Sequence, residues 1–317
     1  KKNLFLFFQS LENRLEPRVS MKYNINEKIR LKASGGSFSQ NLISTNDDTD
    51  VVSLFTGFLS STDNIPSTFQ NEDINSLLQT ATHYVIGLEY DISNNLNINI
   101  EGYFKKFNQL IGLNRNKIYE DIPEFSNQLD FLKKDFMIER GDARGVDFLL
   151  KYNSKKMNIW SVYSFGIVNR EDELQIYSPH YDRTHNFNFV FSYVMGRKKL
   201  WDLNVRWNYG SGFPFTQSQA YFEDLDLSNI NLSEFINTNG NLGIIYSDLN
   251  EGRLPDYHRL DISLTKKINL KNSTFMEIAL GVTNLYDRSN IFYYDRVNAV
   301  RINQLPIMPN VGFNWTF

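Results

Sequence analysis

Four histidines could supply an imidazole for catalysis or for a metal ion: His83, His180, His185 and His258. His180 and His185 flank Asp182, but two imidazoles five positions apart on an extended chain do not converge on one metal. The sequence contains no cysteine, which excludes disulfides, thiolate zinc sites and thiol nucleophiles. We therefore expect no metal site and no cofactor.

The segment 211–256 combines aromatic rings with carboxylates, which suits the capture of a large ligand. Aromatic faces supply apolar contact area, and carboxylates accept hydrogen bonds. The side chains that we expect to bind a ligand are Phe213, Phe215, Tyr221, Phe222, Glu223 and Asp224. The alternative is that these side chains fold the segment on itself.

The elements that position these residues are strands in which apolar and polar residues alternate, a pattern typical of a strand with two different environments. Tyr84, Ile86 and Leu88 share one face, for example, and Glu89 lies on the other. The expected strands span residues 17–24, 28–40, 82–93, 96–110, 142–153, 157–169, 184–195, 200–210, 257–268, 273–285 and 308–317. Residues 3–9 could form a twelfth. Most have ten or more residues, and a tilted transmembrane strand needs about 9–11.

The overall composition agrees with strands that are apolar on one face only. Aromatic residues make up 15% of the chain, yet the mean hydropathy is −0.40. No run of about 20 apolar residues, as a transmembrane helix requires, is present. The net charge of −3 indicates no basic surface for nucleic acid.

Short and long connections alternate along the chain. Tight polar turns lie at 24–27, 93–95, 154–156, 196–199 and 269–272. Long segments lie at 41–81, 111–141, 170–183, 211–256 and 286–307. Outer-membrane barrels have short periplasmic turns and long extracellular loops. The sequence therefore predicts an all-β, transmembrane antiparallel barrel in a bacterial outer membrane, with its long loops extracellular and its C-terminus at the periplasmic rim.

The alternation also separates a lipid face from a lumenal face. A Lys or Arg that meets lipid at mid-depth costs roughly 2–4 kcal/mol, so the face without charges is the one expected to meet lipid. The residues expected to face the lumen or a plug are Arg30, Glu89, Glu101, Asp147, Arg206, Arg259 and Asp261. They either form a cross-strand network that solubilises the wall or contact a plug domain.

A hydrolytic site in such a barrel would need a serine at the lipid rim beside a histidine and an orienting polar group. Ser192 and Ser263 face the lumen in the expected register instead. We therefore expect no catalytic residues and a protein that is not an enzyme.

Several segments carry recognisable motifs. Residues 251–261 read EGRLPDYHRLD, residues 209–216 read YGSGFPFT, and residues 282–287 read VTNLYD. The first resembles a stretch before the third-last strand of TonB-dependent receptors of Bacteroidota. The other two are similar to that family's G-x-P-[FY]-T and NLYD segments, and residues 15–18 and 141–147 resemble its strand starts.

The resemblance implies an active-transport receptor: a barrel of about 22 strands with a plugged lumen, extracellular ligand loops and energy from TonB. Its partners would be outer-membrane lipid, an unidentified extracellular ligand, TonB through the plug and a surface lipoprotein. Eleven or twelve strands are about half of such a barrel. Residues 1–317 are thus expected to be its C-terminal portion, with the plug domain and signal peptide outside this sequence. The alternative is a self-contained twelve-stranded passive channel or an outer-membrane enzyme.

Overall fold

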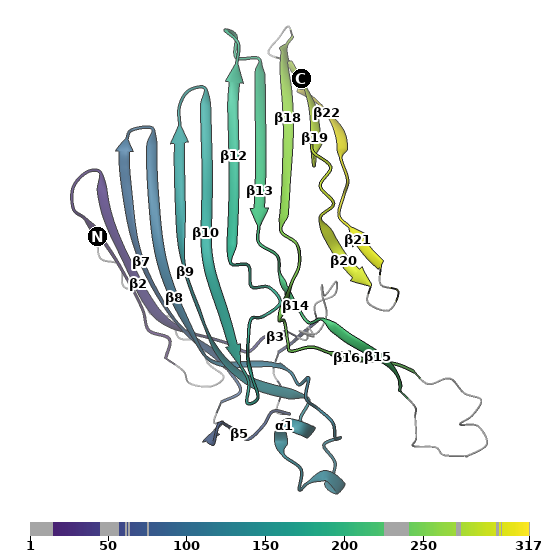
Figure 1. Ribbon diagram of the computed structural model, residues 1–317. Coiled ribbons are helices and arrows are strands. Elements are labelled where there is room, and N and C mark those ends of the chain that lie inside the picture. The colour runs from purple at the N-terminus through teal and green to yellow at the C-terminus, as the bar shows by residue number, and fades with distance from the viewer. Residues whose placement is uncertain are drawn as a thin grey trace.

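The computed structural model describes residues 15–44, 57–60, 62, 64–74, 76–224, 241–270, 274–295, 298 and 300–316, and consists mainly of one large antiparallel sheet (Figure 1). The strands along the sheet, in spatial order, are β1 (Arg18–Asn24), β2 (Ile29–Gln40), β7 (Gln79–Ser93), β8 (Leu96–Leu113), β9 (Phe136–Asn153), β10 (Met157–Glu171), β12 (His185–Met195), β13 (Trp201–Gly210), β18 (Tyr257–Asn269), β19 (Phe275–Thr283) and β22 (Met308–Thr316). The two-residue strand β11 (Ile176–Tyr177) pairs with β10. The eleven predicted strands are confirmed; the expected strand at 3–9 lies outside the described residues.

The short turns lie at one end of the sheet and the long connections at the other, here called the turn end and the long-loop end (Figure 1). Short elements fill the long-loop end: β3 (Ile43–Ser44), β4 (Phe58–Leu59), β5 (Thr68–Phe69), β6 (Glu72–Asp73), the 3-10 helix η1 (Pro123–Phe125), α1 (Asp130–Lys133), β14 (Pro214–Phe215), β15 (Ser218–Asp224), β16 (Asn241–Tyr246), β17 (Gly252–Arg253), β20 (Ile291–Asp295) and β21 (Val300–Asn303). In the described ranges, no helix has the length and apolarity needed to cross a membrane.

Cross-strand register produces two faces of opposite character. Leu88, Ile100 and Phe148 stand opposite one another on β7, β8 and β9, and the same row continues through Tyr163 and Phe187. We call this side the apolar face. Its side chains are largely uncovered, and Ile86 is 66% exposed. The opposite side carries the charged residues and is called the polar face.

Strands β8 and β9 continue further into the long-loop end than the sequence predicted. The predicted strands end at residue 110 and begin at residue 142. Between these two positions, Ile111 of β8 pairs with Ile138 of β9. These side chains are buried beneath Ile43, Ile65 and Phe69 of the connection between β2 and β7. The apolar side of the extension is therefore covered by protein, whereas the apolar face nearer the turn end is not.

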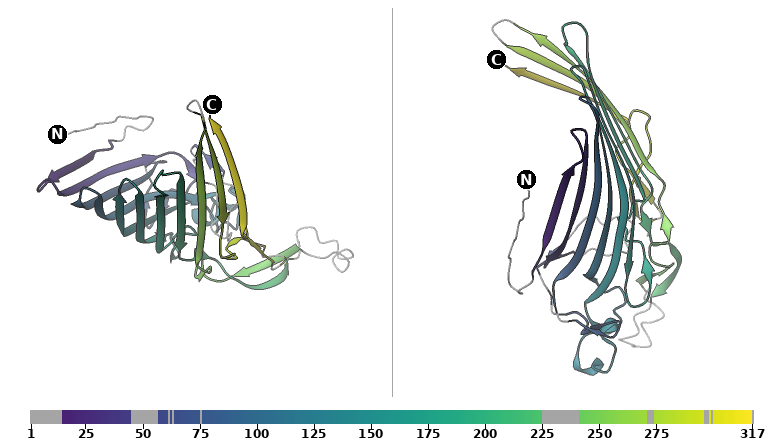
Figure 2. Two further views of the ribbon diagram at one scale, coloured as in Figure 1. Left: turned by 90° about the horizontal axis from the view of Figure 1, so that it is seen from above. Right: turned by 90° about the vertical axis from the view of Figure 1, so that its left-hand side faces the viewer.

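The curved sheet has two edges, β1 and β22 (Figure 2). Within the described residues, each of these strands pairs with a neighbour on one side only, so the barrel is not closed. The described strands thus form one open, curved sheet.

Candidate functional site

The seven residues expected to face the lumen lie on one side of the sheet. Register places Arg30 opposite Glu89, and Glu101 opposite Asp147. Arg206 stands opposite Asp261. Arg259 lies two residues before Asp261 in β18 and therefore on the same face. Residues directly opposite in an antiparallel pair share a face, and alternate residues of a strand do so too. The structure therefore collects all seven on the polar face.

Ion pairs connect this face across four strands. Glu89 of β7 lies 2.9 Å from both Arg30 and Lys32 of β2, and 3.6 Å from Lys22 of β1. Lys32 also lies 3.8 Å from Glu101 of β8. The geometry matches a cross-strand network along the wall. Exposed pairs of this kind stabilise a fold little, typically by about 0–1 kcal/mol each.

Like charges meet at one position of the polar face. Glu101 and Asp147 are directly opposite on β8 and β9, an arrangement that is unfavourable without a nearby cation. Lys32 approaches Glu101, and in the described part of the chain no cation forms an ion pair with Asp147. The carboxylate of Asp147 therefore stands on the polar face without a neutralising cation among the described residues.

The aromatic and acidic residues proposed for ligand binding divide into two groups. Phe213 packs beneath the guanidinium of Arg183 at 4.0 Å, and Phe215 of β14 pairs with Gly252 of β17. Tyr221, Phe222 and Glu223 lie instead on the two-stranded ribbon of β15 and β16, which projects from the long-loop end (Figure 1). Asp224 ends β15. The structure brings Phe213 and Phe215 to the base of the connection and leaves Tyr221 and Phe222 half-exposed on opposite faces of the ribbon.

The EGRLPDYHRLD motif joins connections at the long-loop end. Arg253 donates to the Asp182 carboxylate at 2.7 Å. Asp256 accepts a hydrogen bond from the Tyr209 hydroxyl at 2.8 Å and one from the Gly212 amide at 3.1 Å. The motif thus fixes how the long connection re-enters β18.

The NLYD motif forms the turn after β19. Asn284 has a φ of 54°, in the left-handed region that asparagine tolerates better than most residues. Its side-chain amide donates to the carbonyls of Arg288 and Leu305, and its backbone N–H donates to Asp261. Asp287 accepts from the Ile307 amide at 2.8 Å. Both motifs therefore have structural roles at the ends of the last strands.

The histidines lie apart from one another and pack against aromatic residues. His83 stacks on Phe38 with ring centroids 4.3 Å apart. The Nδ1 atoms of His185 and His258 lie 2.9 Å and 2.7 Å from the hydroxyls of Tyr163 and Tyr286. In the ranges that the structure describes, no three metal-binding side chains come together. The predicted absence of a metal site stays a prediction.

A polar cavity of about 420 Å³ lies at the long-loop end. Its lining residues come from four strands and the connections beyond them, and include Gln40, Gln79, Asn114, Arg115, Arg170 and Tyr181. Gln40 and Gln79 are opposite one another and belong to the polar face. The cavity therefore opens on the side of the sheet that carries the charge network.

A buried charge cluster supports one wall of this cavity. Glu139 is 1% exposed and accepts hydrogen bonds from Arg115 at 3.0 Å, Arg170 at 3.1 Å and the Tyr177 hydroxyl at 2.6 Å. Arg115 also pairs with Asp172 at 2.6 Å. Burial by itself would lower the pKa of Arg115, but Tyr177, Glu139 and Asp172 outweigh it and raise that pKa. Two guanidinium groups thus balance two carboxylates, so the wall is polar without strong net charge.

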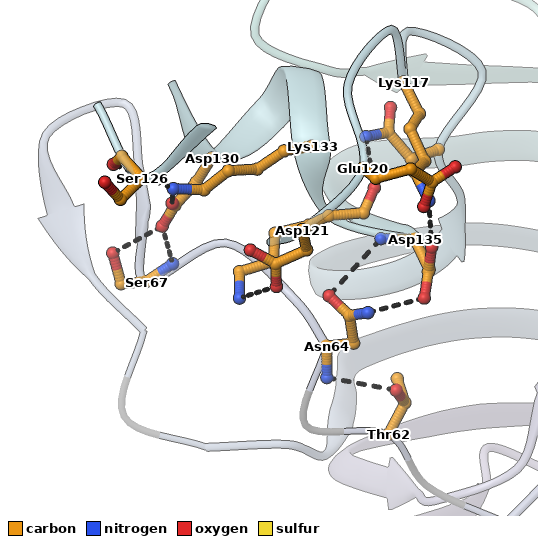
Figure 3. Close-up of polar contacts among 12 residues, drawn as sticks. Thr62, Asn64, Ser67, Lys117, Glu120, Asp121, Ser126, Asp130, Lys133 and Asp135 are labelled. Carbon is orange, nitrogen blue, oxygen red and sulfur yellow. Dashed lines mark hydrogen bonds and ion pairs between the residues drawn. The ribbon is translucent and has the colours of Figure 1, made fainter. Parts of the chain in front are cut away.

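The connection between β8 and β9 is fastened to the one between β2 and β7 (Figure 3). Asp130 at the start of α1 accepts hydrogen bonds from the amide and the hydroxyl of Ser67, at 3.2 Å and 2.9 Å. Lys117 lies 2.8 Å from Asp135 and 2.9 Å from Glu120, and these hydrogen bonds raise the pKa of Lys117. These polar contacts hold the two connections together, and Asp135 also lines the cavity.

The alternation pattern does not predict this cavity, because residues 111–141 were expected to be a long connection. A signal was present in β9, where Phe136 and Ile138 begin the alternation. In β8, a register shift between Phe107 and Leu110 puts Ile111 out of phase with the earlier apolar positions, so simple alternation does not extend that strand. The residues that hold Glu139 come from the connection after β8, from β10 and from β11, and no local pattern of the sequence joins them.

Comparison with known proteins identifies the sheet. The family model described as TonB dependent receptor-like, beta-barrel matches residues 6–285. The pyoverdine outer membrane receptor FpvA of Pseudomonas aeruginosa superposes with a TM-score of 0.55 at 12% identity, covering 96% of this chain and 36% of that chain. The ferric yersiniabactin uptake receptor FyuA of Yersinia pestis gives 0.54 at 12% identity, with 94% and 35% covered.

BauA, the ferric preacinetobactin receptor of Acinetobacter baumannii, gives a TM-score of 0.54 at 10% identity, with 95% of this chain and 36% of that chain covered. This chain thus spans about a third of the length of these receptors, and identities this low show a common fold alone. No curated protein sequence matches the chain. Because the family model covers most of the sequence, the chain belongs to the TonB-dependent receptor family and represents part of its outer-membrane β-barrel.

Proposed function

We propose that these residues form the C-terminal part of the barrel of an outer-membrane receptor that imports a ligand with energy supplied through TonB. The observation that carries the proposal is the sheet itself, which has an apolar face that protein does not cover towards the turn end, and an opposite face that carries a network of charges. A barrel wall between lipid and a plugged lumen needs this division. The plug and its TonB contact belong, in this proposal, to a part of the protein outside these 317 residues. The Bacteroidota type indicated by the motifs belongs to the same proposal.

The orientation in the membrane follows from the lengths of the connections. Long connections with their own short strands lie at one end of the sheet, and turns of two to five residues lie at the other. Bacterial barrels keep the short turns periplasmic. The long-loop end is accordingly extracellular, and β22 runs towards the periplasmic rim.

Ligand capture is assigned to two neighbouring features of the long-loop end. One is the polar cavity beside Arg115 and Arg170, which offers hydrogen-bond donors and acceptors in a defined arrangement. The other is the ribbon that carries Tyr221 and Phe222, both of which are half-exposed. Ligand-binding residues concentrate on loops held by a rigid scaffold, and the sheet is such a scaffold. Whether a surface lipoprotein assists capture is a further part of the proposal.

Uptake in cells tests the transport function. Cells that make the full-length protein and cells without its gene would be compared for uptake of labelled ferric citrate, ferric pyoverdine, cobalamin and a starch oligosaccharide, with and without TonB. We expect saturable uptake of one probe that requires both the receptor and TonB. Entry that rises linearly with concentration and ignores TonB would instead identify a passive channel.

A binding measurement with TonB tests the proposed energy coupling and does not require that the transported ligand be known. The purified full-length protein would be titrated with the periplasmic domain of TonB. Saturable binding supports an energised receptor, and its absence contradicts the proposal even if the protein assembles as a barrel. A test for hydrolysis of phospholipid vesicles by the same preparation checks the expectation that the protein is not an enzyme.

A further inference from the structure

A groove of about 640 Å³ crosses the apolar face near the long-loop end. It lies between two rows of residues that cross-strand register defines. The row nearer the turn end consists of Ala33, Ile86, Gly102, Val146 and Phe165. The row nearer the long-loop end consists of Gly35, Tyr84, Phe104, Arg144 and Ile167. Both rows cross β2, β7, β8, β9 and β10.

The depth of the groove comes from a missing side chain. A Cβ atom added at Gly102 would meet nothing closer than the Cγ2 atom of Ile86, at 3.9 Å. The open space above Gly102 is bordered by Ile86 and Val146 in its own row and by the Phe104 ring in the next. An apolar channel of this shape accommodates a hydrocarbon chain.

Arg144 is the charged residue in the lining of this otherwise mostly apolar groove. Its side chain is exposed on the apolar face, and among the described residues it makes neither a hydrogen bond nor an ion pair. The neighbouring outward cation Arg140 differs, because it is paired with Glu72. Arg144 therefore has its donors available to a molecule outside the protein.

The position of Arg144 corresponds to the edge of the lipid-facing band. Towards the turn end, the same side of β9 presents Phe148 and Leu150. In the next row towards the long-loop end, the residues on the apolar face are polar: Lys106 lies opposite Asp142, and the two form no ion pair. Charged side chains at this depth meet lipid head groups and not hydrocarbon.

We propose that this groove binds a phosphate-bearing membrane lipid, with an acyl chain over Gly102 and the phosphate on the guanidinium of Arg144. A guanidinium offers a planar fork of donors that matches a phosphate. The inference rests on the proposed function, because it requires the apolar face to lie in a membrane. It concerns a lipid that accompanies the receptor and not the ligand that the receptor transports.

Native mass spectrometry of the full-length protein, released from nanodiscs of equal parts phosphatidylglycerol and phosphatidylcholine, tests the proposal. Each variant is first shown to be an assembled, heat-modifiable barrel. We expect preferential retention of phosphatidylglycerol, reduced about tenfold in Arg144→Gln, which removes a charge-assisted hydrogen bond. Gly102→Leu, which fills the groove and keeps the charge, should reduce it as well. Lys266→Gln is the matched control, because Lys266 is an outward cation at the turn end, 4.8 Å from the Trp201 ring.

The outcomes separate this inference from the proposed function. A wild-type protein that does not assemble as a membrane barrel would overturn both. An assembled barrel that retains the two lipids equally, or retains phosphatidylglycerol undiminished in Arg144→Gln or Gly102→Leu, overturns the lipid site alone. The lipid could also be displaced by inorganic phosphate added at the same concentration as the lipid head groups. That result would show that Arg144 binds any phosphate, and it would contradict a role for the groove in holding the acyl chain. If Arg144→Gln fails to assemble, Gly102→Leu and Arg144→Lys decide, with loss of retention expected in the first and partial retention in the second, because lysine keeps the charge but not the fork of donors.

Discussion

The guanidinium of Arg253 donates a hydrogen bond of 2.7 Å to the carboxylate of Asp182, 71 residues earlier in the chain. Asp182 is 2% exposed, and its other oxygen accepts a hydrogen bond from the Val168 amide at 3.2 Å. Arg253 also donates to the backbone carbonyl of Asp182 at 3.2 Å. One arginine of the EGRLPDYHRLD motif thereby links the connection before β18 to the connection before β12.

Arg253→Ala should loosen both connections, because it leaves the buried Asp182 carboxylate without its cation. Loss of a partner for a buried acceptor costs about 1–3 kcal/mol, and the lower part of that range applies since the Arg253 side chain is 41% exposed. Hydrogen exchange of the full-length protein should then rise at least about fivefold in residues 170–183 and 211–217. Arg197→Ala, at an exposed turn, is the control. Equal exchange in the two variants would show that the link contributes nothing.

The register of β7 is open to a direct test. Spin labels at Ile86 and at Glu89 should differ in environment, because Ile86 is uncovered on the apolar face and Glu89 is held by Arg30 and Lys32 on the polar face. A lipid-soluble quencher is expected to reach the label at Ile86 more readily. Greater access at Glu89 would mean that lipid meets the other face.

Leu150→Arg should impair assembly far more than Lys151→Ala. Leu150 lies on the apolar face of β9 opposite Ile98, and the next residue points to the polar face. A charge at lipid depth costs roughly 2–4 kcal/mol, whereas truncation of a lumenal side chain removes none of the lipid contact. The amount of heat-modifiable barrel in outer membranes measures the difference. Comparable amounts for both variants would refute the face assignment.

Acid should open the connection between β8 and β9 through Asp130. Burial would raise the pKa of Asp130, but hydrogen bonds from Ser67 and the nearby Lys133 outweigh it and lower that pKa below its ordinary value of 3.8. A group with a lowered folded pKa stabilises the fold above the unfolded value and loses that contribution as pH falls through the folded pKa. Proteolysis by pepsin at residues 114–135 should therefore accelerate below about pH 4. Asp130→Asn should be cleaved faster already at higher pH, with a smaller increase on acidification; an unchanged pH profile would exclude this carboxylate as the cause.

Shortening residues 217–245 in the full-length protein should leave assembly nearly intact, because the main sheet makes its hydrogen bonds without them. Residues 225–240 of this segment lie outside the described residues. If Tyr221 and Phe222 contact the ligand, uptake should weaken at least tenfold, about 1.4 kcal/mol. Tyr221→Ala combined with Phe222→Ala provides the finer comparison. Wild-type uptake by the shortened protein would show that Tyr221 and Phe222 are not needed for ligand binding, and would leave the polar cavity beside Arg115 as the candidate site.

The local pattern of the sequence was sufficient to predict the strands and their faces. A strand alternates its side chains with a period of two, so the environments of Ile86 and Glu89 follow from the chain itself once one face is apolar. Tight turns between antiparallel neighbours extend this alternation to the whole sheet, and the sequence therefore predicts that the seven polar-face residues lie on one side. The alternation of short and long connections similarly predicted the two ends.

Only the tertiary structure showed how the long connections return to the strands. Glu139 is held by Arg115, Arg170 and Tyr177, three residues brought together by folding and not by any local repeat. The extension of β8 and β9 depends on a cover of Ile65 and Phe69 from another connection, which alternation within those strands cannot reveal. For the same reason the aromatics of segment 211–256 looked like one group in the sequence, although cross-strand pairing places Phe215 at the base and Tyr221 on the ribbon. Periodicity within a strand reports its faces, but contacts between connections depend on how the whole sheet curves and closes at its long-loop end.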